Sequence, residues 1–132
     1  MKANSPPGPA RILLVEDDLA VRMFMRDVLQ ESGYHIWEAS DCREALNIWK
    51  TNASQIDLLL ADLAMPGGLN GRELADKLRH ERPDLKVIFI SGFVPDMAET
   101  SHMLRSFLQK PFTPESLTEI VQSHLGTARL TG

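Results

Sequence analysis

Five short apolar segments alternate with segments of helical periodicity, and this alternation constrains the fold more than any other feature of the sequence. Three of these segments contain unbroken apolar runs, ILLV, LLLA and VIFI, rather than alternating apolar and polar residues, as strands do when helices cover both faces of a parallel sheet. The predicted strands are Arg11–Val15, Tyr34–Ala39, Ile56–Ala61, Lys86–Ile90 and Phe107–Gln109. We therefore predict an α/β domain with a doubly wound, five-stranded parallel sheet.

Helix-capping residues mark the starts of the helices that should follow these strands. Asp41 and Asn70 each stand three residues before a glutamate, which is the spacing of a capping box. Thr113 precedes a proline that suits the first turn of a last helix. The third helix should begin near Gly71, and a fourth, over about 95–104, contains weak helix formers. The pattern thus predicts five helices around the sheet.

The chain has room for one ordinary domain, because it contains 132 residues. We expect residues 10–125 to fold and residues 1–9 and 126–132 to be loose tails, because both ends lack the apolar residues that offset the entropy of ordering. The net charge of −4 disfavours a general binder of nucleic acid or anionic membranes. No apolar run has the length of a membrane span, and the single cysteine, Cys42, fits a reducing compartment, so we expect a cytoplasmic protein.

Polar side chains stand at the carboxyl ends of four predicted strands, where open α/β sheets bind their ligands. Glu16 and Asp17 follow the first strand, and Asp62 follows the third. Ser91 and Lys110 follow the fourth and fifth. If the strand order is 2-1-3-4-5, the three carboxylates meet at one edge of the sheet. Carboxylates about 4 Å apart repel by about 4 kcal/mol at an effective dielectric of about 20, so the cluster must hold protons or a cation, and such oxygen ligands favour Mg²⁺.

The same groups indicate phosphoryl chemistry. A metal ion and Lys110 together neutralise the charge on phosphoryl oxygens, and Ser91 adds a hydroxyl donor. Asp62 is the natural nucleophile, because it ends a central strand. A phosphatase with a carboxylate nucleophile would use a similar set, but such enzymes usually carry a second aspartate two residues on, and here that residue is Ala64.

Four segments together resemble the signature regions of the response-regulator receiver domain of two-component signalling. They are ILLVEDD at 12–18, LLLADLAMPGGLNGREL at 58–74, VIFISGF at 87–93 and FLQKPF at 107–112. The resemblance covers roughly residues 10–125 and implies a flavodoxin-like fold, with a parallel sheet of order 2-1-3-4-5 and five helices. It implies a regulatory domain that catalyses only its own phosphorylation and dephosphorylation.

The resemblance also implies a metal site and a phosphoryl acceptor. Asp62 resembles the aspartate that becomes aspartyl phosphate, and Asp17 resembles the principal Mg²⁺ ligand. Glu16 resembles the second acidic residue of the pair, although most members carry aspartate there. The backbone carbonyl of Ala64 matches the main-chain metal ligand.

The remaining signature residues imply a conformational switch. Lys110 resembles the lysine that pairs with the phosphoryl group, and its peptide bond to Pro111 is expected to be cis. Ser91 resembles the switch hydroxyl and Phe107 the rotating aromatic. These residues are expected to reshape a face made by the fourth helix, fifth strand and fifth helix. The phosphoryl donor would be the phosphohistidine of a histidine kinase or a histidine phosphotransfer protein, and a downstream protein would bind the reshaped face.

Two departures bear on the context of the domain. The loop MPGGLNG at 65–71 is one residue longer than the usual form and is similar to receivers attached to hybrid histidine kinases, so a receiver fragment of such a kinase stays open beside a stand-alone receiver. Residues 105–106 are Arg-Ser where the family often has Gly-Ala, which could displace the approach to the fifth strand.

Overall fold

A single parallel sheet organises the computed structural model, which describes residues 9–65, 69–92 and 106–126. The strands are β1 (Arg11–Val15), β2 (His35–Ala39), β3 (Leu58–Asp62), β4 (Lys86–Ser91) and β5 (Phe107–Gln109). Their order is β2-β1-β3-β4-β5, with every pairing parallel, as predicted. Because all five strands run in the same direction, their carboxyl ends lie together at one edge of the sheet, which we call the carboxyl edge.

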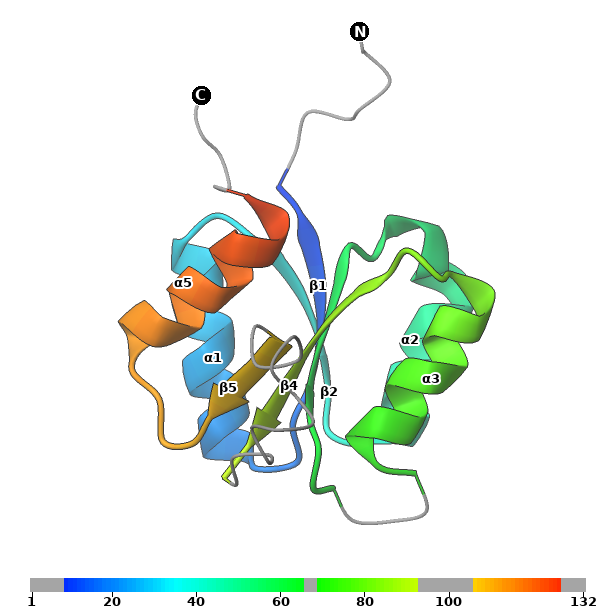
Figure 1. The fold of residues 1–132 in the computed structure, drawn as a ribbon, viewed down its shortest axis with the longest axis horizontal. Coiled ribbons are helices and arrows are strands. Elements are labelled where there is room, and N and C mark those ends of the chain that lie inside the picture. Colours follow the sequence, from blue (N-terminus) through cyan, green and yellow to red (C-terminus); the bar gives the residue numbers. More distant parts are fainter. Residues whose placement is uncertain (1–8, 66–68, 93–105, 127–132) are drawn as a thin grey trace, which may run out of the picture.

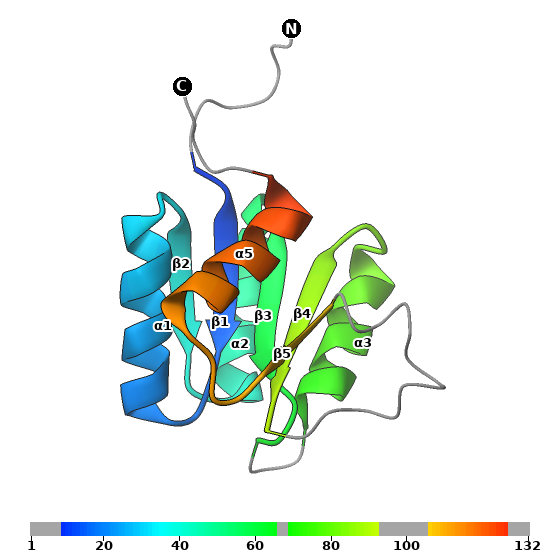
Figure 2. The ribbon, with the colours of Figure 1, turned by 60° about the vertical axis from the view of Figure 1, so that its left-hand side comes forward.

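Helices cover both faces of this sheet (Figures 1 and 2). The described helices are α1 (Leu19–Glu31), α2 (Cys42–Asn52), α3 (Gly71–Glu81) and α5 (Pro114–Leu125), with a short 3-10 turn η1 (Ala53–Gln55) after α2. α1 and α5 pack on one face, and α2 and α3 pack on the other. The expected fourth helix at about 95–104 lies outside the described residues, as do almost all residues of the two expected tails. No helix in the described ranges has both the length and the apolar character needed to cross a membrane.

The sheet separates two apolar layers, which explains the continuously apolar segments. In β3 every residue is buried, and successive side chains alternate between the layers. Leu58 and Leu60 face α1 and α5, whereas Leu59 packs with Trp49 of α2 and Leu78 of α3. A strand that is covered on both faces needs apolar residues at every position, so the usual alternation of apolar and polar residues along a strand disappears.

The predicted bounds of β1 and β5 are confirmed, whereas those of β2, β3 and β4 differ from the structure by one or two residues. β3 begins at Leu58 rather than Ile56, because Asp57 instead bonds to both backbone groups of Arg11: its N–H donates to the Arg11 carbonyl, and its carboxylate accepts from the Arg11 N–H. At the other end, β3 and β4 each extend one residue further, so Asp62 and Ser91 belong to the strands themselves. Backbone pairing therefore holds both residues in place.

The capping predictions are confirmed for α3 and in part for α2. Asn70 and Glu73 form a complete capping box, in which each side chain accepts from the other's backbone N–H. Asp41 caps α2 by accepting from the N–H of Glu44. The carboxylate of Glu44, however, accepts from the N–H and hydroxyl of Ser40 rather than from Asp41, so the second half of that box is wrong.

α3 begins against the end of β3, and Gly71 makes this close approach possible. Its N–H donates to the carbonyl of Leu63, at 3.3 Å. A Cβ at position 71 would overlap the carbonyl oxygen of Asp62 and would lie 3.2 Å from the Leu63 Cα. Only glycine lets the helix start this near to the backbone of Asp62.

Replacing Gly71 should therefore disturb the fold at the site. We expect Gly71→Ala to lower the free energy of unfolding by about 1–3 kcal/mol, because the added methyl group meets rigid backbone. Gly92→Ala is the matched control, since a Cβ there has nothing within 4 Å. Urea denaturation of both variants measures the difference, and equal effects would contradict the proposed role of the close approach.

Candidate functional site

Three charged side chains from different strand ends meet at the carboxyl edge of the sheet. Glu16 directly follows β1, Asp62 ends β3, and Lys110 directly follows β5. The Lys110 Nζ lies 2.6 Å from Oδ2 of Asp62 and 3.1 Å from Oε1 of Glu16. The backbone N–H of Lys110 donates to the backbone carbonyl of Ser91 at 2.8 Å, which fixes the lysine beside the end of β4. The structure thus brings together residues whose positions in the sequence predicted a common edge.

A metal ion fits among the acidic residues. Carboxylate oxygens of Glu16, Asp17 and Asp62 all lie within 4.8 Å of one another. Oε2 of Glu16 accepts from the backbone N–H of Asp18 at 3.0 Å, whereas its buried Oε1 accepts no directed hydrogen bond in the described part of the chain, although Lys110 lies near it. An oxygen with a lone pair left over, next to an exposed aspartate, suits a hard cation such as Mg²⁺ with water in its coordination shell.

Burial and mutual charge shift the protonation of these groups. Loss of water contact raises the pKa of Glu16 to about 7, and the negative charge of Asp62 adds to this rise, while the Asp18 N–H and Lys110 oppose it. Burial works against the charged form of Lys110, but its hydrogen bond to Asp62 and its ion pair with Glu16 outweigh that effect and hold the pKa of Lys110 above its ordinary value. Lys110 is therefore a permanent cation in this cluster.

The other predicted site residues lie around this cluster. Ser91 is buried at the end of β4, one residue beyond the register partner of Asp62. Ala64 donates its N–H to Oδ1 of Asp62 at 2.9 Å; a metal contact by its carbonyl stays a prediction. The cis peptide bond before Pro111 is confirmed. Phe107 begins β5 and is half-buried, so its ring has both protein and solvent around it.

Arg22 supports the site, and no motif in the sequence indicated it. One of its terminal nitrogens donates to the backbone carbonyl of Glu16 at 2.9 Å, and its Nε donates to Glu38 at 3.1 Å. Arg26 also reaches Glu38 at 3.1 Å, so two residues of α1 are anchored to β2. These contacts hold the chain where it leaves β1 for the acidic pair. Finding them from the sequence would need the register of β2 against α1, which helical spacing alone does not provide.

Comparison with known proteins identifies the class to which this fold and site belong. Residues 12–122 match the response regulator receiver domain family. The chain therefore belongs to this family, whose members are regulatory domains of two-component signalling. This match favours a receiver over the phosphatase that the carboxylates alone would also allow.

Individual relatives include both hybrid-kinase and response-regulator receivers. The chain is 37% identical over 127 residues to the sensor kinase CckA of Brucella abortus. The aligned region covers 94% of this chain and 13% of CckA. It is 39% identical over 83 residues to the response regulator receiver protein CpdR of the same species, covering 63% of this chain and 67% of CpdR. The solved receiver domain of the hybrid histidine kinase CckA superposes with a TM-score of 0.73 at 41% identity, covering 87% of this chain and 98% of that one. The chain thus spans about an eighth of the length of CckA.

Removing the Glu16 charge should stabilise the protein when no metal is present. At pH 8 we expect Glu16→Gln to raise the free energy of unfolding by about 1–3 kcal/mol, because a buried carboxyl with a raised pKa costs stability once it is ionised. The gain should vanish as pH falls from about 7 to 4.5, since the folded state then holds the proton. Urea unfolding over this pH range measures the effect.

Magnesium should stabilise the wild type and the Glu16→Gln protein to different extents. Because glutamine offers no carboxylate, we expect saturating Mg²⁺ to stabilise the wild type more than Glu16→Gln. Glu119→Gln, at an exposed position of α5, is the matched control and should behave as the wild type. A Glu16→Gln protein that is less stable than the wild type at pH 8 without metal would contradict the electrostatic argument.

Proposed function

We propose that this receiver accepts a phosphoryl group on Asp62 from the phosphohistidine of a histidine kinase or a histidine phosphotransfer protein, and that the modification switches its shape. The observation that carries the proposal is the 2.6 Å contact between Lys110 Nζ and Asp62, beside a carboxylate cluster that can hold a cation. A carboxylate that is both nearly buried and paired with a fixed cation is suited to attack phosphorus, because the cation offsets the charge that arrives.

The proposed transfer uses the residues in distinct roles. A carboxylate oxygen of Asp62 bonds to phosphorus as the phosphorus–nitrogen bond breaks, and the histidine ring leaves with the electron pair. Lys110 moves its ion pair from Asp62 to a phosphoryl oxygen, while the Ala64 N–H remains directed at Oδ1. Mg²⁺, held by Asp17, Asp62 and Glu16 with the Ala64 carbonyl, would neutralise charge on the phosphoryl oxygens when bound. The chain catalyses its own modification and its reversal, and no other reaction is proposed.

The proposed switch turns the new charge into a change of surface. A phosphoryl dianion attracts the hydroxyl of Ser91 and the ammonium of Lys110, and Phe107 then turns toward the space that the hydroxyl leaves. β5 and α5 form the described part of the face that would change; the expected fourth helix is outside the described residues. A downstream protein partner would bind this face in its phosphorylated form.

Phosphorylation by a small-molecule donor tests the acceptor. With acetyl phosphate and Mg²⁺, the wild type should gain the mass of one phosphoryl group, and Asp62→Asn should gain none, because an amide is not a nucleophile at phosphorus. Asp76→Asn, at an exposed position of α3, is the matched control and should gain the same mass as the wild type. A wild type that gains no mass, or an Asp62→Asn protein that gains the full mass, would show that the proposal is wrong.

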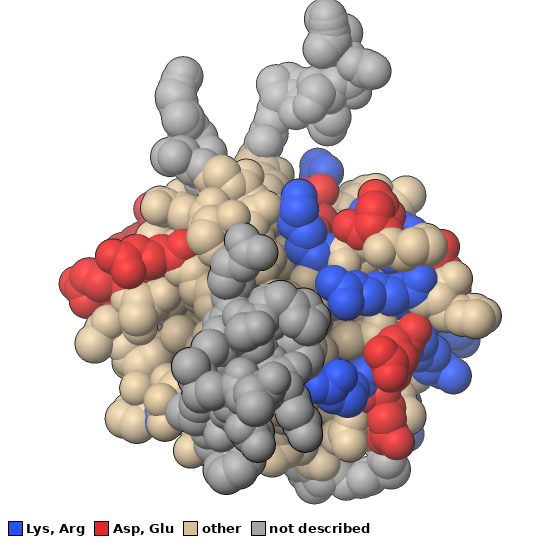
Figure 3. All heavy atoms as spheres, in the orientation of Figure 1, with Lys and Arg blue, Asp and Glu red and all other residues tan. Residues whose placement is uncertain are grey.

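The context of the domain is proposed in two forms. CckA supports a receiver within a hybrid histidine kinase, and CpdR supports a receiver that acts outside a kinase. In both cases the cytoplasm is the proposed compartment, because a phosphohistidine donor is made from ATP. We do not propose a nucleic-acid partner: over α3, on the face drawn in Figure 3, basic and acidic side chains are interspersed rather than separated into a basic patch.

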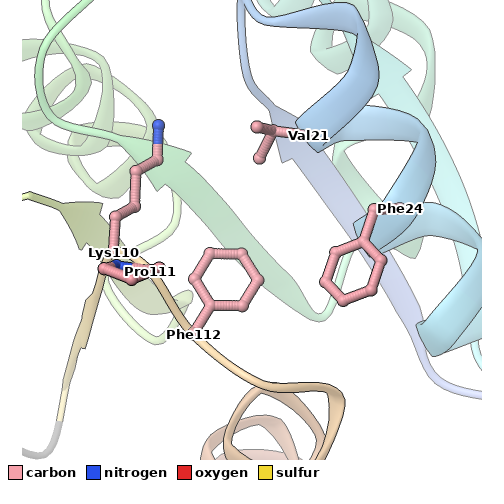
Figure 4. A pocket seen from close by; sticks show the side chains of 5 residues that line it. All are labelled: Val21, Phe24, Lys110, Pro111 and Phe112. Carbon is pink, nitrogen blue, oxygen red and sulfur yellow. The ribbon is translucent and has the colours of Figure 1, made fainter.

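An apolar surface beside the site is proposed to receive the phosphoryl donor. Leu19, Met23 and Phe24 of α1 are the exposed large hydrophobic residues of the described chain, at 59%, 41% and 39% exposure. Only Asp18 separates the start of this helix from the acidic pair Glu16 and Asp17, so the surface lies near the carboxylate cluster. A hollow of about 400 Å³ lies here, and Figure 4 shows its lining side chains, which come from α1 and from the segment after β5: Val21, Phe24, Lys110, Pro111 and Phe112.

This surface suits a helical partner that must bring a histidine to Asp62. Phe24 and Phe112 face each other across the hollow, with ring centres 6.1 Å apart, and Lys110 forms part of both the hollow and the site. A partner helix seated here would bury apolar side chains of α1 and hold its histidine near the carboxylate. Small phosphodonors need no such contact, so the two kinds of donor can be told apart.

Mutation of Phe24 should separate docking from chemistry. We expect Phe24→Ser to slow phosphotransfer from a phosphorylated histidine kinase by about tenfold or more, because an apolar anchor of the interface is lost. The rate with acetyl phosphate should stay within about twofold of the wild type. Lys50→Ser, at an exposed position of α2 on the opposite face of the sheet, is the control. Equal slowing with both donors would contradict docking at this surface.

A further inference from the structure

The ring of Phe107 rests against a second aromatic ring, which the sequence analysis did not single out. Its ring centre lies 5.7 Å from that of Phe89, and the ring planes meet at 43°. The two residues are register partners across β4 and β5, so the contact is built into the pairing of the strands. Phe89 is buried, at 6% exposure, and therefore forms a firm support for the half-buried Phe107.

An arginine lies over the ring of Phe89. The guanidinium carbon of Arg72 is 5.5 Å from the ring centre, which is within the range of a cation–π contact. Arg72 is exposed, and no carboxylate within residues 9–65, 69–92 and 106–126 forms an ion pair with it. The aromatic ring is thus its partner in the described structure.

The position of Arg72 is set by the backbone of the proposed phosphoryl acceptor. Arg72 is the second residue of α3, and the first residue, Gly71, lies against the carbonyl of Asp62. The first turn of α3 therefore contacts the end of β3 through one residue and the aromatic pair through the next. A shift in the backbone at Asp62 would therefore displace Gly71 and, with it, the backbone of Arg72.

We propose that Arg72 is a positioning residue for the switch, which holds the Phe89–Phe107 pair together and so opposes the turning of Phe107 toward Ser91. This inference rests on the proposed function. Phe89 and Ser91 are alternate residues of β4, so their side chains lie on one face of the sheet, about 7 Å apart along the strand. Phe107 must give up its contact with Phe89 to approach Ser91.

The guanidinium acts on only one of the two arrangements. It restrains the ring of Phe89 in the orientation that Phe107 contacts, and this restraint stabilises the pair while Phe107 stays on Phe89. Once Phe107 has turned toward Ser91, the ring of Phe89 has lost that neighbour, and restraining it no longer stabilises Phe107. A contact that differs between two states shifts their balance, whereas a contact present equally in both does not.

Binding of beryllofluoride, a mimic of the phosphoryl group, tests this inference. In the presence of Mg²⁺, we expect Arg72→Gln to bind beryllofluoride about two- to fivefold more tightly than the wild type, which is the factor expected from losing an exposed cation–π contact. Arg72→Lys keeps a cation and should lie between the two. Lys77→Gln, at an exposed position of the same helix, should bind as the wild type does.

A double-mutant cycle separates this role from a general effect on α3. In a Phe107→Leu background, Arg72→Gln should leave beryllofluoride affinity unchanged, because the Phe107 ring that the Arg72–Phe89 contact is proposed to hold in place is gone. Phe89→Leu provides a second background if Phe107→Leu does not fold, as judged by circular dichroism. An unchanged or weaker affinity of Arg72→Gln, or an equal effect in both backgrounds, would overturn the inference. A wild type that binds no beryllofluoride would overturn the proposed function itself, so the two failures are distinguishable.

Discussion

The contact of Lys110 with two carboxylates is the interaction on which the site depends. Lys110 follows the edge strand β5, whereas Asp62 ends the central strand β3 and Glu16 follows β1. One ammonium group therefore links the outermost strand, β5, to the inner strands β1 and β3. Without that cation, two nearly buried negative charges would face each other with little water to screen them. The ion pairs with Lys110 thus hold the two carboxylates together.

The same cluster shows a conflict between stability and proposed function. Glu16 is fully buried, and its raised pKa records the cost of holding a charge away from water. An apolar or amide side chain would suit a buried position better, yet it could not serve as an oxygen ligand with a negative charge. Sites that depart from what stability favours are expected where a protein must bind or react. The proposed ligand role of Glu16 would account for a carboxylate at a position where burial disfavours one.

The sequence predicted the sheet well because burial on both faces leaves a strong pattern. The run Leu58–Ala61 is apolar at every position, and Asp62, which follows it, is therefore easy to identify. Strand ends were predicted less well, because hydrophobicity does not record how far backbone pairing continues. Asp57 is a clear case: its bonds to Arg11 place it before β3, although it stands within an apolar run.

Contacts between residues distant in the chain were beyond the sequence analysis. Arg22 reaches Glu38, and Arg72 reaches Phe89, and in each case the partners meet only because the sheet places two elements side by side. Gly71 was predicted as the start of a helix, but its contact with Asp62 follows from how closely α3 approaches β3. Local spacing predicts elements and caps; it does not predict which side chain of a helix lies over which residue of a strand.

The carboxylate site is built from the ends of strands, whereas the exposed side chains beside it belong to helices. Asp62 and Ser91 are held by backbone pairing, and Glu16 by burial, so these residues have little freedom to change. The outer residues of α1 contact solvent and carry no such restraint, as the exposure of Leu19 and Met23 shows. The proposed docking surface and the proposed acceptor site therefore meet at Lys110 but differ in how firmly their other residues are held. If α1 binds the phosphoryl donor as proposed, substitutions on its outer face would change the signalling partner and leave Asp62 and Glu16 in place.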